Sequence, residues 1–243
     1  MTDKLPKVSI LIPTYNRRKF TTLIIYNLNN LHYPRELLEV VIYDDHPSEP
    51  HFIDKDEVYK FEKCINIKVK YIYNPSRHLS IGEKRNKLVK NASHNLLFHL
   101  DTDDLYLPTA LIYSLKEMEE NKWSLTGSSQ MLFLYPEKNF ETSGIKCDQK
   151  RLIHEATMLY TRKHWKSMGG FSKTSSNEGC RMIEGIESKV GDLDITKLMI
   201  CVCHGSNTIS KDHFHKVSES IGEVSDDIKY LLSNILDLKF EKN

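Results

Sequence analysis

The segment Leu96-Leu97-Phe98-His99-Leu100-Asp101-Thr102-Asp103-Asp104 predicts both a fold and a site. Its apolar residues predict a buried strand, and three carboxylates follow where that strand ends. Carboxylates that crowd together raise each other's pKa, and a divalent cation removes this cost. Alternate residues at a strand end point to the same side, so Asp101 and Asp103 can share one hard cation, Mn²⁺ or Mg²⁺. A solvated acidic turn is the competing interpretation.

Composition limits the class of protein. The 243 residues carry a formal net charge of +1, so we expect no nucleic-acid partner. The sequence has no run of about 18 apolar residues, so no transmembrane segment is expected. The polar start, Met1 to Lys7, argues against a signal peptide. Five cysteines, an odd number, fit a reducing compartment, and we expect a cytoplasmic location.

Apolar runs alternate with helical patterns in the first half of the chain. Strands are predicted at 8–12, 40–43, 69–73 and 96–100, and helices at 20–31, 81–92 and 111–118. A capping box from Ser80 to Glu83 marks the start of the second helix. Further strands are predicted at 131–135, 157–160 and 198–202, with a short helix at 162–167. This alternation predicts an α/β fold with a mostly parallel central sheet and helices on both faces.

Polar segments follow three of these strands at their carboxyl ends, where such sheets bind ligands. They are Pro13 to Asn16, Asp44-Asp45 and Asp101 to Asp104, and we expect them to converge. We treat residues 1–215 as one domain. The tail, residues 216–243, has apolar residues at helical spacing, and it is expected to pack on the domain or at a homodimer interface.

Six segments carry a family resemblance by their order and spacing. They are Val8-Ser9-Ile10-Leu11-Ile12-Pro13-Thr14-Tyr15-Asn16-Arg17, Val41-Ile42-Tyr43-Asp44-Asp45, Gly82-Glu83-Lys84-Arg85-Asn86, Leu100-Asp101-Thr102-Asp103-Asp104, Gly169-Gly170-Phe171 and Asn177-Glu178-Gly179. Over about residues 6–210 the chain resembles a family 2 glycosyltransferase with the GT-A fold, which is Rossmann-like. The resemblance implies an inverting, metal-dependent transferase that uses a nucleotide-diphosphate sugar.

The resemblance also implies a nucleotide-binding role for residues at the three strand ends. Tyr15 would lie against the base, and Asp44, or Asp45 beside it, would accept a hydrogen bond from the base. Arg85 would lie near the diphosphate. The full expected nucleotide-binding set is Pro13, Thr14, Tyr15, Arg17, Asp44, Asp45, Arg85, Asp101 and Thr102.

By the same resemblance, Asp101 and Asp103 match the family's Asp-x-Asp signature and would hold Mn²⁺ or Mg²⁺, with His204 as a further ligand. Asp104 would ligate or support the metal site. Glu178, seven residues after Phe171, would be the general base. The family's frequent Glu-Asp pair is Glu178-Gly179 here. That departure leaves Glu184, or Asp194, as a competitor.

The expected reaction is transfer of a single sugar, because the Gln-x-x-Arg-Trp motif of processive synthases is absent. A uridine diphosphate sugar is the favoured donor, and guanosine or thymidine donors remain alternatives. The acceptor is a glycan, a lipid-linked sugar or a protein side chain.

Two other functions compete with glycosyl transfer. A sugar-1-phosphate nucleotidyltransferase would need a glycine-rich loop after the first strand, and Pro13 to Asn16 contain no glycine. A degraded Asp-x-Asp motif or a missing base candidate would favour a non-catalytic member that only binds a nucleotide sugar or glycan, and both are intact here.

Overall fold

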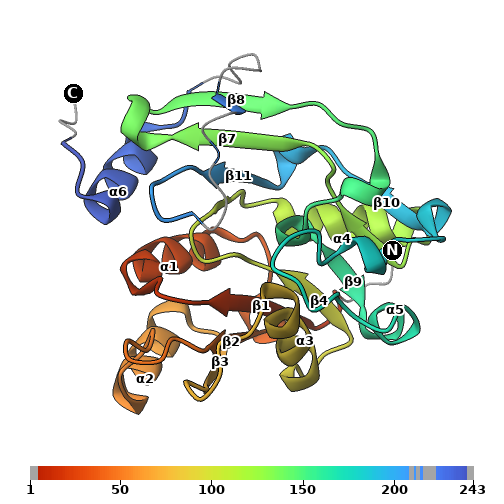
Figure 1. The fold of residues 1–243 in the computed structure, drawn as a ribbon, viewed down its shortest axis with the longest axis horizontal. Coiled ribbons are helices and arrows are strands. Elements are labelled where there is room, and N and C mark those ends of the chain that lie inside the picture. Colours follow the sequence, from red (N-terminus) through yellow and green to blue (C-terminus); the bar gives the residue numbers. More distant parts are fainter. Residues whose placement is uncertain (1–4, 208–210, 212–213, 216–222, 240–243) are drawn as a thin grey trace.

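The computed structural model describes residues 5–207, 211, 214–215 and 223–239, and it contains two sheets with helices packed around them (Figure 1). The larger sheet has the strand order β10-β6-β9-β4-β1-β2-β3, and the smaller has the order β5-β11-β7-β8. The strands are β1 (Val8–Thr14), β2 (Leu38–Asp44), β3 (Lys68–Tyr73), β4 (Leu96–His99), β5 (Leu105–Tyr106), β6 (Leu125–Gly127), β7 (Met131–Tyr135), β8 (Glu141–Ile145), β9 (Leu159–Thr161), β10 (Val190–Asp192) and β11 (Met199–Val202). The helices are α1 (Thr21–Asn30), α2 (Lys55–Ile65), α3 (Ile81–Asn91), α4 (Ala110–Glu120), α5 (Arg162–Ser167) and α6 (Asp226–Leu236).

Four neighbouring strands form the parallel part of the larger sheet. Strand β1 pairs in parallel with both β2 and β4, and β2 pairs in parallel with β3. In this register Thr14 lies opposite Asp44, so the polar segments after β1 and β2 leave the sheet side by side. Strand β9 is antiparallel to its neighbours β4 and β6, which makes the sheet mixed. The predicted mostly parallel α/β architecture is confirmed.

Helices cover both faces of this sheet because successive side chains of a strand point to opposite faces. Ile10 and Ile12 of β1 belong to the apolar cluster that contains residues of α1, α2 and α4. Leu11, between them, belongs to a second cluster with Leu88 and Val89 of α3. The central strand is therefore buried on both faces, which explains its unbroken apolar sequence.

Helix α3 begins at the predicted capping box. The Ser80 hydroxyl accepts the backbone N–H of Glu83 at 3.3 Å, and the Glu83 carboxylate accepts the backbone N–H of Ser80 at 3.1 Å. The first turn of α3 also lies very close to another backbone segment. A Cβ added at Gly82 would lie 1.8 Å from the carbonyl oxygen of Ser172. Glycine at this position therefore lets the first turn of α3 contact the segment that leads to Glu178.

The structure also contains elements that the sequence did not predict. Helix α2 begins after Asp54, whose side chain accepts the backbone N–H of Glu57 at 2.9 Å. The smaller sheet, which lies above the larger one in Figure 1, was not predicted as a separate sheet. It takes the predicted strands at 131–135 and 198–202 out of the central sheet and joins them to β5 and β8.

Helix α6 carries the described part of the tail. Its residues Leu232 and Ile235 are buried in a cluster with Phe20, next to α1, and Leu134 of β7. Residues 216–222 and 240–243 of the tail lie outside the described residues. Within the described ranges, no helix has the length and apolar character needed to cross a membrane.

Replacement of the α3 cap tests this account of the helix start. Ser80→Ala removes a side-chain acceptor from an otherwise unpaired backbone N–H, so we expect the free energy of unfolding to fall by about 1 kcal/mol. Urea denaturation measures the change. Ser225→Ala is the matched control, because Ser225 also precedes a helix but its side chain makes no cap hydrogen bond. Equal losses in the two variants would contradict the assignment.

Candidate active site

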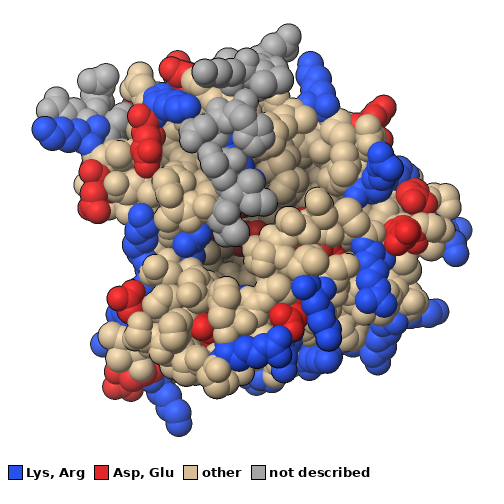
Figure 2. Space-filling view, in the orientation of Figure 1, with Lys and Arg blue, Asp and Glu red and all other residues tan. Residues whose placement is uncertain are grey.

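The polar segments after β1, β2 and β4 meet at one edge of the larger sheet, as predicted. Lys84 of α3 joins two of them. Its ammonium group lies 2.5 Å from an oxygen of Asp45 and donates to the carbonyl oxygen of Thr14 at 3.3 Å. Arg17 joins the first segment to the third, because its Nε donates to Asp103 Oδ2 at 2.8 Å. Figure 2 shows the cleft in front of this edge, with acidic atoms at its floor.

Arg85 of α3 lies at the centre of the site and is only 3% exposed. Its two Nη atoms donate to the two carboxylate oxygens of Asp101, each at 3.1 Å, and its Nε donates to Glu178 Oε1 at 3.1 Å. Burial by itself would lower the pKa of Arg85, but the carboxylates of Asp101 and Glu178 raise it above its ordinary value. One guanidinium thus fixes two carboxylates that come from distant parts of the sequence.

His99 of β4 supports Arg85 from behind. Its Nδ1 lies 3.0 Å from Arg85 Nη1, and its Nε2 lies 2.8 Å from the hydroxyl of Tyr160. Arginine only donates hydrogen bonds, so Nδ1 accepts and Nε2 carries the hydrogen. Burial lowers the pKa of His99, and the charge of Arg85 lowers it further. His99 is therefore a neutral, buried positioning residue, which the sequence analysis treated only as part of a strand.

Asp103 and His204 approach each other across the cleft. His204 Nε2 lies 3.3 Å from Asp103 Oδ2, the oxygen that also accepts from Arg17. The imidazole of His204 packs against Phe20, with ring centroids 4.8 Å apart, and its Nδ1 contacts the Ser206 hydroxyl at 2.8 Å. Burial would raise the pKa of Asp103, but the hydrogen bond from His204 and the charge of Arg17 lower it.

A small hollow, which we name the strand-end pocket, contains most of the expected nucleotide-binding residues. Its volume is about 100 Å³, and it is lined by Pro13, Thr14, Tyr15, Arg17, Ile81, Lys84, Asp101, Thr102 and Asp103. The ring of Tyr15 lies between two imidazoles, with centroids 4.7 Å from His46 and 4.4 Å from His78. Both imidazoles are tilted against the Tyr15 ring, by 59° for His46 and by 54° for His78.

Asp44 and Asp45 do not line this pocket. Asp44 is 1% exposed and accepts hydrogen bonds from the backbone N–H groups of His46 and His51 and from the Tyr71 hydroxyl. Asp45 is fully buried and is held by Lys84 and by a backbone N–H. Both carboxylates are thus bonded to groups of the protein itself in this structure, and their contact with a base stays a prediction.

A larger hollow of about 380 Å³, the central cavity, adjoins the strand-end pocket and shares Ile81, Asp101 and Asp103 with it. Glu178 lines this cavity and is 4% exposed. Burial raises the pKa of Glu178, Arg85 opposes the rise and Glu155 adds to it, so the pKa lies above its usual value. The two hollows thus join the Asp-x-Asp segment to a carboxylate with increased basicity.

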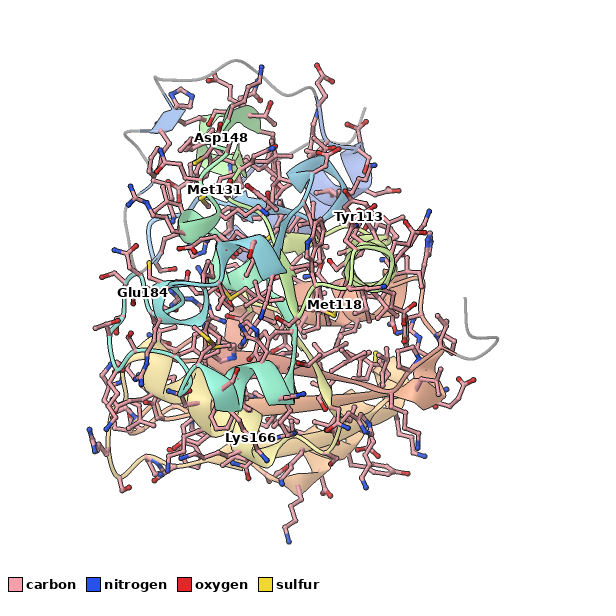
Figure 3. All side chains as sticks on the ribbon, turned by 90° about the vertical axis from the view of Figure 1, so that its right-hand side faces the viewer. Tyr113, Met118, Met131, Asp148, Lys166 and Glu184 are labelled. Carbon is pink, nitrogen blue, oxygen red and sulfur yellow. The ribbon has the colours of Figure 1, made fainter. Side chains whose placement is uncertain are left out.

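The competing base candidates lie elsewhere. Glu184 is exposed (Figure 3) and does not line the central cavity. Asp194 caps a short 3-10 helix, where its carboxylate accepts the backbone N–H of Thr196 at 3.0 Å. Of the three base candidates, Glu178 is therefore the one that lines the central cavity.

Asp104, which was expected to ligate or support the metal site, is buried, and its carboxylate accepts the backbone N–H of Val202 at 3.1 Å.

Several cavity residues were missed by sequence reasoning. His154 and Glu155 line the wall near Glu178, and burial lowers the pKa of His154 to about 4. No motif spacing marks these two residues, although an adjacent His-Glu pair before a predicted strand was a visible signal. Among the described residues, no three His, Cys, Asp or Glu side chains converge as a metal-binding group.

Known proteins resemble this chain in sequence. The sequence profile of glycosyl transferase family 2 matches residues 9–171. An uncharacterized glycosyltransferase from Rickettsia bellii is 33% identical over 124 residues, which are 51% of this chain and 16% of that protein. The poly(ribitol-phosphate) beta-N-acetylglucosaminyltransferase TarS of Staphylococcus aureus is 30% identical over 98 residues, which are 40% of this chain and 16% of the relative. Each match therefore spans a small part of the relative's length.

Solved structures share the fold. The mannosyltransferase PcManGT from Pyrobaculum calidifontis, in complex with GDP-Man and Mn²⁺, superposes with a TM-score of 0.65 at 16% identity, over 88% of this chain and 60% of that chain. S. aureus TarS 1–349 in complex with UDP-GlcNAc superposes with a TM-score of 0.61 at 15% identity, over 97% of this chain and 68% of that chain. The fold is that of the GT-A glycosyltransferases, and this chain belongs to glycosyl transferase family 2.

Proposed function

We propose that this chain transfers a single sugar from a nucleotide-diphosphate sugar to an acceptor hydroxyl with inversion at the anomeric carbon. The observation that carries the proposal is the Arg85 bridge. It ties Asp101, shared by the strand-end pocket and the central cavity, to Glu178 in the cavity. A donor in the pocket and an acceptor in the cavity would then meet beside Asp101.

The strand-end pocket would hold the nucleotide. Tyr15 offers a ring face, and Arg17 and Lys84 provide positive charge for the diphosphate. A uridine diphosphate sugar is our favoured donor. Complexes of two GT-A proteins with UDP-GlcNAc and with GDP-Man support the nucleotide-sugar class, and the GDP-Man complex keeps a guanosine donor open.

A divalent cation fits one pair of side chains best. Asp103 and His204 present a carboxylate oxygen and an imidazole nitrogen 3.3 Å apart, a donor set that suits Mn²⁺. Asp101 gives both of its oxygens to Arg85, so it orients Arg85 in this structure. When bound, the metal would neutralise negative charge on the leaving diphosphate. Asp103 and His204 would hold it beside Arg17.

Glu178 would act as the general base. As the acceptor oxygen attacks the anomeric carbon, the acceptor proton passes to the carboxylate of Glu178. The new glycosidic bond forms while the bond to the diphosphate breaks, and the nucleoside diphosphate leaves on the opposite face. Arg85 Nε donates a hydrogen bond to Oε1 of Glu178, and this contact orients the carboxylate.

Removal of the Asp103 carboxylate tests the metal assignment. With Asp103→Ala, we expect calorimetric titration of uridine diphosphate to lose the part of the affinity that depends on Mn²⁺. Guanosine and thymidine diphosphate are titrated in parallel, because they distinguish a different base preference from a missing site. Asp148→Ala is the control, since Asp148 is exposed and lies outside both hollows (Figure 3). Mn²⁺-dependent affinity that survives in Asp103→Ala would refute the assignment.

Loss of the base should affect transfer and leave donor binding intact. Glu178→Gln keeps a hydrogen-bond acceptor for Arg85 but cannot take a proton at neutral pH. We expect the transfer rate to fall by about 10²–10⁴-fold, with unchanged calorimetric binding of the nucleoside diphosphate. Glu184→Gln, an exposed substitution, should leave the rate unchanged. A near-normal rate for Glu178→Gln would remove Glu178 from the reaction.

A further inference from the structure

Gly179 is a glycine for reasons of space. Its φ of −82° and ψ of −17° lie in the right-handed helical region, which any residue adopts. A Cβ at this position would lie 2.7 Å from Cγ and 2.8 Å from Oε1 of Glu155, and 2.8 Å from Cε of Met158. The carboxyl group of Glu155 thus fills the volume that a side chain at position 179 would occupy.

The two carboxylate oxygens of Glu155 differ in their hydrogen bonds. Glu155 begins a short 3-10 helix, Glu155–Thr157, and its Oε1 accepts the backbone N–H of Gly179 at 2.7 Å. Within the described part of the chain, no group hydrogen-bonds Oε2. Glu155 is half-buried and lines the central cavity beside Glu178. The carboxylate is therefore anchored at one end and leaves one acceptor for a ligand.

The anchoring bond to Gly179 does not require a charged residue at position 155. Glutamine would accept the N–H of Gly179 equally well. The negative charge of Glu155 is instead placed next to Glu178, where like charges repel each other. Arg85 is already shared between Asp101 and Glu178. A cavity wall that places a second carboxylate beside Glu178 is typical of a functional site.

We propose that Glu155 is a second acidic residue of the acceptor site, in the place that the side chain at 179 would otherwise take. This inference rests on the proposed function. Glu155 Oε2 accepts a hydrogen bond from the acceptor, and Glu178 takes the proton of the hydroxyl that attacks the anomeric carbon. Glu155 orients the acceptor and keeps Glu178 basic.

Removal of the charge is the first test. Glu155→Gln keeps the bond to Gly179, so we expect an unchanged unfolding temperature and unchanged Mn²⁺-dependent binding of uridine diphosphate. The transfer rate should fall by about 10- to 100-fold, as expected for a lost hydrogen bond to a charged acceptor. The rate is measured as nucleoside diphosphate released from UDP-GlcNAc or GDP-Man, with water as the acceptor where no sugar acceptor is found.

The pH profile separates this role from a purely structural one. Glu178 must be ionised to take a proton, so the rate rises with pH through the pKa of Glu178. The groups that face Glu178 are Arg85, Glu155, His154 and Cys180. Glu155→Gln removes only the like charge, so the pKa of Glu178 falls and the acid limb moves to lower pH. An unmoved limb would show that the charge of Glu155 does not act on Glu178.

Relocation of the carboxylate gives the sharpest test. Gly179→Asp alone should fold poorly or lose activity, because its Cβ collides with Glu155. In the double variant Glu155→Ala/Gly179→Asp, the collision with Glu155 is relieved, and only the end of the flexible Met158 side chain must shift. A carboxylate returns to the same volume, so we expect a higher rate than in Glu155→Ala. The double variant Glu155→Ala/Gly179→Asn is the matched control, since it restores the volume without the charge.

The outcomes distinguish this inference from the proposed function. A wild-type rate and an unmoved acid limb in Glu155→Gln, while Glu178→Gln is inactive, would overturn the role of Glu155 alone. Equal rates in the two double variants would also overturn it, because volume rather than charge would then matter. Normal transfer by Glu178→Gln, or a wild-type chain that binds no nucleoside diphosphate with or without Mn²⁺, would instead overturn the proposed function.

Discussion

The site depends on one constraint, which is that the buried guanidinium of Arg85 must be fully paired. An arginine that is 3% exposed is tolerated only where carboxylates and other acceptors surround it. Asp101 comes from the end of β4, and Glu178 comes from a segment much later in the chain. Helix α3 can meet both because Gly82 allows its first turn to approach Ser172. Folding of the two halves is thereby coupled to assembly of the site.

Local signals predicted the first half of the fold well. The apolar strands, the capping box at Ser80 and the convergence of the strand ends follow from periodicity and from sheet geometry. Helix α2 was missed although Asp54 is an N-cap and Val58, Phe61 and Ile65 are spaced for one face. The smaller sheet was missed because β11 pairs with β5 and β7 across long separations, and a single sequence carries no record of such pairing.

The residues of the site also divide into those that local sequence signals predicted and those that depend on long-range packing. Most residues of the strand-end pocket lie at or just after the ends of β1 and β4, so their positions could be predicted from the sheet, whereas Ile81 and Lys84 come from α3. The contacts of Glu178 and the place of Glu155 depend on how two irregular segments pack, which residue spacing does not encode. The family profile ends at residue 171, before Glu178 and His204. The profile match therefore covers the strand-end pocket and leaves out the proposed base and the proposed histidine ligand.

Strand β5 follows the Asp-x-Asp segment at once and pairs with β11, which leads to His204. The spacing between Asp103 and His204 is therefore set by the register of two paired strands, in which Tyr106 lies opposite Met199. A slip of one residue would displace the imidazole by about 3.4 Å. Strand β7, which lies in the long segment between β5 and β11, pairs in parallel with β11 and supports the same strand, with Val202 opposite Leu134. The distance between the two side chains is therefore preserved only by sequence changes that keep both pairings of β11, with β5 on one side and with β7 on the other.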